Sequence, residues 1–155
     1  MAQVIEQQGM EAAAKLIAGG STRIQHQIKD PRGWEEFLLR LSEHSAKGTA
    51  LTLRGVQKRR ASLYEEEEGL KRLQLPTLII VGDEDEGCLE PSLFMKRTIS
   101  ASGLVVLPKT GHNLNLEEPA LFNAACQDFF FRAEAGHWKV RDPRAVSTSF
   151  LGARR

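Results

Sequence analysis

An unbroken apolar run is the feature that most constrains the fold of this 155-residue chain. Residues 77–81, Thr-Leu-Ile-Ile-Val, lie between Pro76 and Gly82 and show no alternation with polar residues. A strand of this kind must be covered on both faces, as it is in a parallel sheet packed between helices. A second run, residues 104–107, ends at Pro108. The two runs predict neighbouring parallel strands of an α/β fold.

The segment between these runs predicts a crossover helix, which we expect Pro91 to open because proline suits a first helical turn. Strand, helix and parallel strand make one βαβ unit, and both strands then end on the same rim of the sheet. A final helix is expected to begin at residues 117–119, Glu-Glu-Pro. Its predicted apolar stripe comprises Leu121, Phe122, Ala125, Cys126, Phe129 and Phe130.

Residues 1–73 predict a series of helices. We expect the first to stop at a left-handed Gly19-Gly20 and another to begin at Asp30-Pro31, with the aspartate as N-cap. On that helix three apolar side chains share one side, which predicts the core of a helical pair or, alternatively, the lining of a substrate pocket. They are Trp34, Phe37 and Leu38.

The pattern therefore divides the chain into three regions. A helical segment at residues 1–73 precedes a strand-and-helix unit at residues 74–135. Residues 136–155 are irregular and basic, and we expect them to form a surface tail.

The composition is that of a globular protein with no bias toward a charged partner. Hydrophobic residues make up 41% of the chain and the formal net charge is +1, so we expect no nucleic-acid partner. The apolar runs are far shorter than the roughly 20 residues of a membrane-spanning helix, and the N-terminus lacks the pattern of a signal peptide. We expect no membrane partner and a cytoplasmic location.

No cofactor and no metal are expected from the sequence. Cys88 and Cys126 are too few for a disulfide framework, and their spacing matches no metal motif. The acidic residues 83–86 lack the pattern of a calcium loop, because Gly87 comes before a third oxygen ligand.

Two side chains with catalytic potential follow the two predicted strands. Asp85 lies in the loop Gly-Asp-Glu-Asp-Glu-Gly after the first strand, and His112 lies in Lys-Thr-Gly-His-Asn after the second. Because both loops leave the same rim, we expect the carboxylate and the imidazole to form a hydrogen bond. Such a carboxylate fixes the tautomer of the ring and stabilises the imidazolium that forms when the ring accepts a proton. Taken singly, each residue also fits a solvated turn.

Residues 74–133 resemble the last two strands and the last helix of the α/β-hydrolase family. The family's acid stands in a Gly-x-x-Asp pattern, which fits Gly82 to Asp85. Its histidine follows a glycine and precedes an acidic, proline-started helix, which fits Gly111-His112. The resemblance implies hydrolysis of an ester or related small-molecule bond by a nucleophile, acid and histidine in that chain order. Asp85 would orient the ring and His112 would act as general base.

The nucleophile of that family does not occur in these residues. It stands in a Gly-x-Ser-x-Gly elbow, and the sequence holds no such pentapeptide. The resemblance therefore implies the C-terminal part of an α/β-hydrolase fold, with residues 1–73 as a helical cap-like segment and an incomplete parallel sheet. Whether the nucleophile is serine or aspartate stays open. So does the substrate, which within this resemblance can be an ester, a lactone, an epoxide, a haloalkane or a compound with an activated C–C bond.

An incomplete sheet has consequences for partners and activity. Two apolar strands leave long unpaired edges and are fewer than a stable sheet needs. We therefore expect a truncated hydrolase that is inactive alone, that self-associates through these edges, and that takes a small-molecule substrate only when another polypeptide completes it. The alternative is a non-catalytic remnant or interaction module of the same fold.

Overall fold

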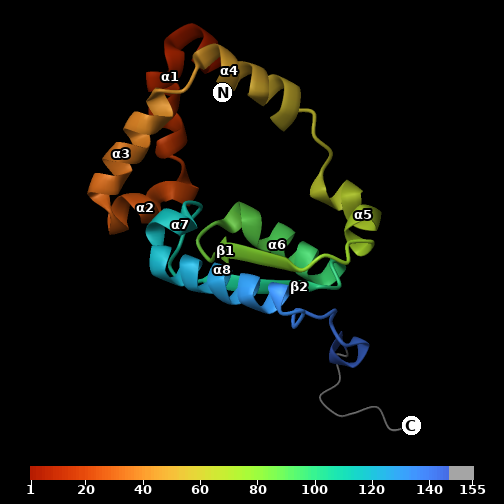
Figure 1. Ribbon diagram of the computed structural model, residues 1–155. Coiled ribbons are helices and arrows are strands. Elements are labelled where there is room, and N and C mark those ends of the chain that lie inside the picture. Colours follow the sequence, from red (N-terminus) through yellow and green to blue (C-terminus); the bar gives the residue numbers. More distant parts are fainter. Residues whose placement is uncertain (147–155) are drawn as a thin grey trace.

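The computed structural model describes residues 1–146. Helices α1 to α4, within residues 2–52, group together at one end of the molecule (Figure 1). Helix α5, Glu67–Lys71, leads from them to a unit made of two strands and their helices. The N-terminal helices also approach this unit through α2, Ile24–Lys29, which contacts α7, Leu114–Glu117. This order, helices first and then a βαβ unit, is the one that the sequence predicts.

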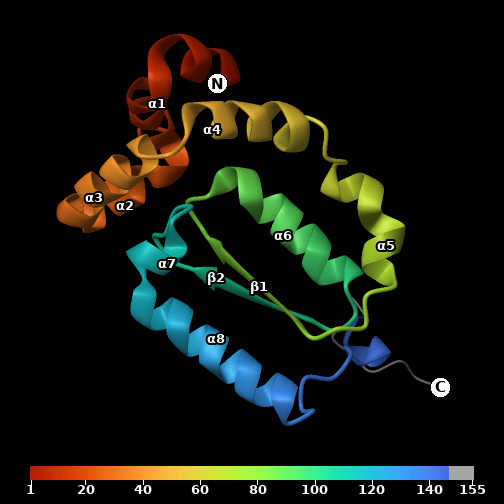
Figure 2. The same ribbon diagram turned by 45° about the horizontal axis from the view of Figure 1, so that its top comes forward.

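The sheet of the described residues consists of β1, Thr77–Gly82, and β2, Ser102–Leu107. The strands are parallel, with Thr77 opposite Ser102 and Gly82 opposite Leu107. Helix α6, Glu86–Thr98, connects them and lies on one side of the strands, and α8, Pro119–Glu134, lies on the other (Figure 2). The covered run of apolar residues thus sits between two helices, as its lack of alternation predicts.

Most of the remaining helical elements are short, and α1 is the longest of them. In chain order they are α1 Ala2–Ala18, η1 Ser21–Arg23, α2 Ile24–Lys29, α3 Pro31–Ser42, α4 Ala46–Thr52, η2 Leu53–Gln57, η3 Leu63–Glu66, α5 Glu67–Lys71, α7 Leu114–Glu117 and η4 Pro143–Val146. The predicted cap at Asp30 is confirmed, because its Oδ1 accepts the Gly33 N–H at 2.9 Å.

The N-terminal helices have a small core of their own. It consists of Ile5, Met10, Ala13 and Ala50, which join α1 to α4. Helix α1 kinks at Gly9, whose φ of 80° is open to glycine and costly for other residues. Small side chains at the contact let α1 and α4 approach closely.

Two helix boundaries differ from the sequence-based expectation. Gly19 and Gly20 have φ of −73° and −66°, so the chain does not enter the left-handed region there and continues into η1. Pro91 lies inside α6, which begins five residues earlier at Glu86. The residue before the helix, Asp85, and the acid in its first turn favour this earlier start.

Part of the expected surface tail packs on the sheet unit. The indole N–H of Trp138 donates to the Ala101 carbonyl at 2.8 Å, and its ring meets Phe129 edge-on at 4.9 Å between centroids. The Arg141 N–H donates to the Ser100 carbonyl at 2.9 Å. The chain up to this point is therefore part of the fold, while residues 147–155 of the expected tail lie outside the described residues.

One edge of β1 is open within residues 1–146. The Thr77 N–H donates to Ala101 and the Asp83 N–H donates to Leu107. In a parallel pair alternate residues face the partner strand, so the backbone groups of Leu78 and Ile80 face outward, where the described residues supply no strand.

Helix α8 is covered less than its sequence predicts. No residue of α8 is buried, and Leu121, Phe130 and Phe131 are 48%, 58% and 71% exposed. The predicted stripe therefore meets the sheet unit along only part of its width. Among the described residues no helix is long and apolar enough to cross a membrane.

Candidate active site

The turn after β1 carries Asp85 into the interior. The Asp85 N–H donates to the Gly82 carbonyl at 3.2 Å, which closes the turn, and the residue then precedes α6. Its side chain is 4% exposed. A carboxylate this deeply buried needs a hydrogen-bonding partner, because its desolvation is otherwise unfavourable.

That partner is the imidazole of His112, as the sequence predicts. The Asp85 Oδ2 and the His112 Nδ1 lie 2.6 Å apart, across 27 residues of sequence. A carboxylate has no hydrogen to donate, so the Nδ1–H of the ring donates and Nε2 keeps its lone pair. The histidine side chain is 46% exposed while the acid is covered. The imidazole is thus partly open to the outside, while the carboxylate is not.

The neighbouring acid, Asp83, has a different position. It is exposed, and its Oδ1 accepts the Thr110 N–H at 3.1 Å. The Glu84 N–H donates to the Thr110 carbonyl at 2.9 Å. These bonds connect the loop after β1 to the loop after β2. Of the two aspartates, only Asp85 contacts the histidine.

Both glycines of the predicted patterns allow the two loops to approach closely. A Cβ on Gly82 would overlap the carbonyls of Thr110 and Gly111, and a Cβ on Gly111 would overlap the Thr22 carbonyl. The backbone approach that brings acid and histidine together therefore excludes a side chain at either position.

The histidine loop is held by groups that sequence reasoning missed. Buried Glu117 accepts the Gly111 N–H at 2.6 Å and the Asn113 N–H at 3.1 Å. The His112 N–H donates to the Thr22 carbonyl at 2.7 Å. The sequence interpretation placed Glu117 in the first turn of the final helix, but it ends α7 and turns back to the loop. Only its four-residue spacing from Asn113 hints at this.

A buried histidine of the N-terminal helices also meets this loop. The side-chain amide of Asn113 donates to His26 Nδ1 at 3.0 Å, and His26 is 1% exposed. The sequence had assigned no role to His26. Its ring packs edge-on against Trp34 and Phe37, which are half-buried.

Cys88 lies beside the acid. Burial, and next the hydrogen bond from its thiol to Asp85, raise the pKa of Cys88 to about 11. Within the described part of the chain Asp85, Cys88 and His112 could offer metal ligands, with donor atoms within 4.8 Å of one another. Two ligands of one tetrahedral zinc lie about 3.3 Å apart when the bonds are about 2.0–2.2 Å. The 2.6 Å between Asp85 and His112 fits a hydrogen bond better.

The pair opens onto a groove of about 400 Å³ along the free side of β1. Its lining includes the acid, the histidine and a largely apolar wall from β1 and α6: Thr77, Leu78, Ile79, Ile80, Val81, Cys88, Pro91, Ser92, Met95 and Leu114. The groove therefore joins the acid and the histidine to the edge of β1 that has no partner strand within residues 1–146.

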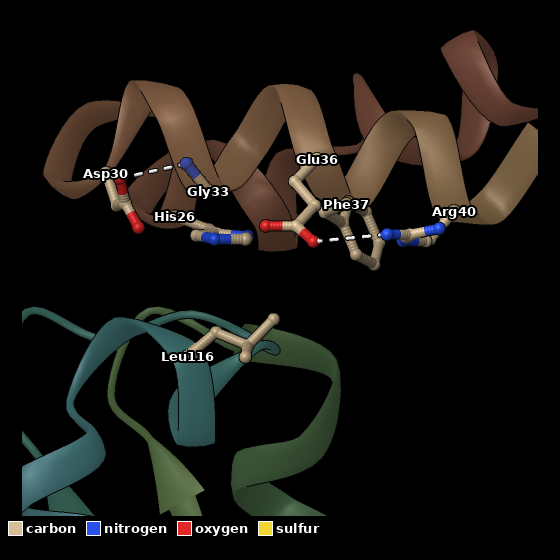
Figure 3. Close-up of a pocket in the computed structure, with 7 residues that line it drawn as sticks. All are labelled: His26, Asp30, Gly33, Glu36, Phe37, Arg40 and Leu116. Carbon is tan, nitrogen blue, oxygen red and sulfur yellow. Dashed lines mark hydrogen bonds and ion pairs between the residues drawn. The ribbon is translucent and has the colours of Figure 1, made fainter.

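A second pocket, of about 470 Å³, is lined by neither Asp85 nor His112. Figure 3 shows side chains of α3 on one side of it and Leu116 on the other. Phe37 contributes to its wall, and Leu38 lines a further pocket of about 470 Å³ formed by residues of α1 and α3. Two of the three residues considered for a substrate pocket thus face hollows, both separate from the groove beside Asp85 and His112.

Comparison with known proteins identifies the fold. No protein-family model matches the chain, and no curated protein matches it. Among solved structures it is similar to MenH from S. aureus, an α/β-hydrolase-type enzyme, with a TM-score of 0.78 and 20% sequence identity over 86% of this chain. The chain has a partial α/β-hydrolase-type fold. It spans about half, 49%, of the length of the structure that it matches. The predicted fold class is therefore confirmed.

Proposed function

We propose that this chain contributes the acid and the histidine of an α/β-hydrolase-type active site. The observation that carries the proposal is the 2.6 Å contact between Asp85 Oδ2 and His112 Nδ1 at the carboxyl ends of two parallel strands. The exposed imidazole and the covered carboxylate have the relationship that general-base catalysis needs. The reaction class is hydrolysis of an ester or related small-molecule bond.

In this proposal His112 moves the proton and Asp85 holds the ring. The Nδ1–H stays bonded to Asp85, so Nε2 is free to accept the proton of a nucleophilic hydroxyl or a water. The imidazolium that results lies against a carboxylate that compensates its charge. The ring then returns the proton from Nε2 to the leaving group.

The nucleophile and the oxyanion hole are proposed to come from a polypeptide outside these residues. The groove beside the pair is continuous with the open edge of β1, which is where further strands can add. General-base help alone gives about 10²–10⁴-fold acceleration, and each missing oxyanion donor removes about 10²–10³-fold. The isolated chain should therefore show no turnover.

Hydrolysis of a nitrophenyl acetate tests this proposal. The purified chain should match its His112→Ala variant, and co-expression with a polypeptide that supplies the missing strands and a Gly-x-Ser-x-Gly elbow should give activity that depends on both Asp85 and His112. The DNA upstream of the Met1 codon is the first place to look for that elbow in frame. A burst of product from the isolated chain, lost on His112→Ala, would mean that the chain already holds a nucleophile.

The second candidate is a non-catalytic interaction module of the same fold. The open edge of β1 and the exposed apolar side chains of α8 favour it, because they offer a surface for another polypeptide without any chemistry. The completed complex separates the two candidates. Activity lost in both Asp85→Asn and His112→Ala supports the hydrolase, and a stable but inactive complex supports the module.

A further inference from the structure

Three consecutive backbone N–H groups around His112 are all bound. Those of Gly111 and Asn113, on either side of the histidine, donate to the two oxygens of Glu117 at 2.6 and 3.1 Å. The N–H of His112 itself donates to the Thr22 carbonyl at 2.7 Å. The peptide units that flank the histidine therefore cannot rotate without breaking a hydrogen bond.

The burial of Glu117 suits it to hold the backbone of the His112 loop. It is 7% exposed, and a carboxylate in that environment depends on its hydrogen bonds. Both of its oxygens are used within one loop, and a charged acceptor makes a stronger bond to an N–H than a neutral one. Because one rigid group spans both sides of His112, it sets the direction in which the ring leaves the backbone.

The N-terminal helices hold the same loop from the opposite side. Besides the Thr22 carbonyl, buried His26 accepts from the Asn113 amide at 3.0 Å. Lys29 Nζ lies 2.6 Å from Oε1 of Glu118, the residue that follows Glu117. Residues more than 80 positions apart in sequence thus converge on the segment that carries the histidine.

From these contacts we propose that Glu117 is a positioning residue, which holds the His112 loop so that the ring meets Asp85. The inference rests on the proposed function for the role of the histidine. Its direct consequence is structural, however, and concerns only the bond between His112 Nδ1 and Asp85 Oδ2. Glu117 does not touch the groove and acts through the backbone of the loop.

The test observes that bond by proton NMR in the full chain. A histidine Nδ1–H bonded to a carboxylate resonates far downfield of the backbone amides, and His112→Ala and Asp85→Asn assign the signal by removing it. Glu117→Gln leaves one acceptor and places a donor against a backbone N–H. We expect it to broaden or remove the signal while the circular dichroism of the folded chain is unchanged. Glu117→Asp keeps the charge on a shorter side chain and should retain part of the signal.

The matched control is Glu134→Gln, at the end of α8. Glu134 carries the same charge and is exposed, and no side-chain hydrogen bond among the described residues joins it to the histidine loop. The control should keep the signal. A folded Glu117→Gln chain with the full signal would overturn the proposal, and so would equal losses in both variants. Either result leaves the hydrolase proposal standing, because that proposal depends on activity in the completed complex.

If Glu117→Gln does not fold, hydrogen exchange in the unmodified chain tests the proposed role of Glu117 instead. The Gly111 and Asn113 amides should exchange much more slowly than the amide of Lys109, an exposed residue of the same loop for which the described residues provide no bonded acceptor. Equal exchange rates at the three amides would show that Glu117 does not hold the loop, and would overturn the proposal.

Discussion

At the residue scale, two aspartates separated by one residue have different environments. The spacing Gly-x-x-Asp predicted that Asp85, and not Asp83, would face His112, and the structure confirms this contact. The physical reason lies in the turn. The chain turns back at Gly82, which directs Asp85 inward, and leaves Asp83 at the surface to bind the Thr110 N–H. That Asp85, and not Asp83, takes part in catalysis remains a prediction.

Replacing Asp85 by asparagine should change the tautomer of the His112 ring. The amide can donate to Nδ1, which favours a proton on Nε2 and removes the lone pair needed for catalysis. In a completed enzyme we expect a loss on the order of 10⁴-fold in kcat. Nitrogen-15 shifts of the His112 ring report the tautomer in the isolated chain. Asp83→Asn, whose amide oxygen can still accept from Thr110, should change neither quantity, and equal effects of both variants would contradict the assignment.

Some residues of the site could not be predicted from the sequence. Glu117 binds backbone groups of residues 111 and 113, so its role depends on the path of a loop and not on a pattern of side chains. Thr22 acts through its carbonyl, which every residue has. The acid and the histidine were predictable because strand ends place them on one rim, whereas these supporting contacts arise only from tertiary structure.

Gly111→Ala should destabilise the fold. The added methyl group would meet the Thr22 carbonyl, and the loop would have to move away from the N-terminal helices. We expect a loss of roughly 1–3 kcal/mol in the free energy of unfolding, measured by urea denaturation. Gly87→Ala is the matched control. It lies in α6 with no atom near the new methyl group, and should be neutral or stabilising by less than about 1 kcal/mol. A neutral Gly111→Ala would show that the loop is not packed as described.

At the scale of elements, the strands were predictable and several helix boundaries were not. The runs at residues 77–81 and 104–107 gave β1 and β2 because their lack of alternation requires cover on both faces. Helix α6 begins before Pro91 because the acid after β1 and the turn that follows it already start the helix. Proline favours the first turn of a helix, but here the turn that holds Asp85 starts the helix five residues before Pro91.

Trp138→Ala tests whether the chain after α8 belongs to the fold. The indole fills the space beside Gly103, packs on Phe129 and donates to the Ala101 carbonyl. A partly exposed tryptophan with these contacts should contribute about 2–3 kcal/mol to the free energy of unfolding. The neighbouring exposed residue serves as control, since Lys139→Ala should stay within about 0.5 kcal/mol. Equal urea midpoints for the two variants would support the original expectation of a surface tail.

At the scale of the whole molecule, the described residues form a group of N-terminal helices and a unit built on a two-stranded sheet. The N-terminal helices bury Ile5 and Met10, and the sheet buries Ile79 and Val81. The sequence does not predict how the N-terminal helices join the sheet unit, because the joining contacts of Thr22, His26 and Lys29 are single long-range bonds. The pattern of apolar residues shows which faces of the elements must be covered. It does not show which distant segment covers them.

The open sheet should make the isolated chain associate with itself. Within residues 1–146, the outward N–H and C=O groups of Leu78 and Ile80 have no partner strand and lie beside an apolar groove of about 400 Å³. Phe130 and Phe131 are exposed on α8. Unpaired edges and exposed apolar surface both favour association. We expect sedimentation to show a mass that rises with concentration, and a hydrophobic dye to bind.

A charge on the open edge should weaken this association. Leu78→Lys places a cation beside the outward backbone groups, the means by which natural edge strands avoid pairing. It should lower both the sedimenting mass and the dye signal. The control Leu16→Lys removes an equally apolar side chain, 57% exposed, from α1, far from the sheet in both views, and should leave the mass unchanged (Figures 1 and 2). If the unmodified chain is a monodisperse monomer that melts cooperatively and binds no dye, its sheet is complete with two strands, and the proposed need for another polypeptide fails.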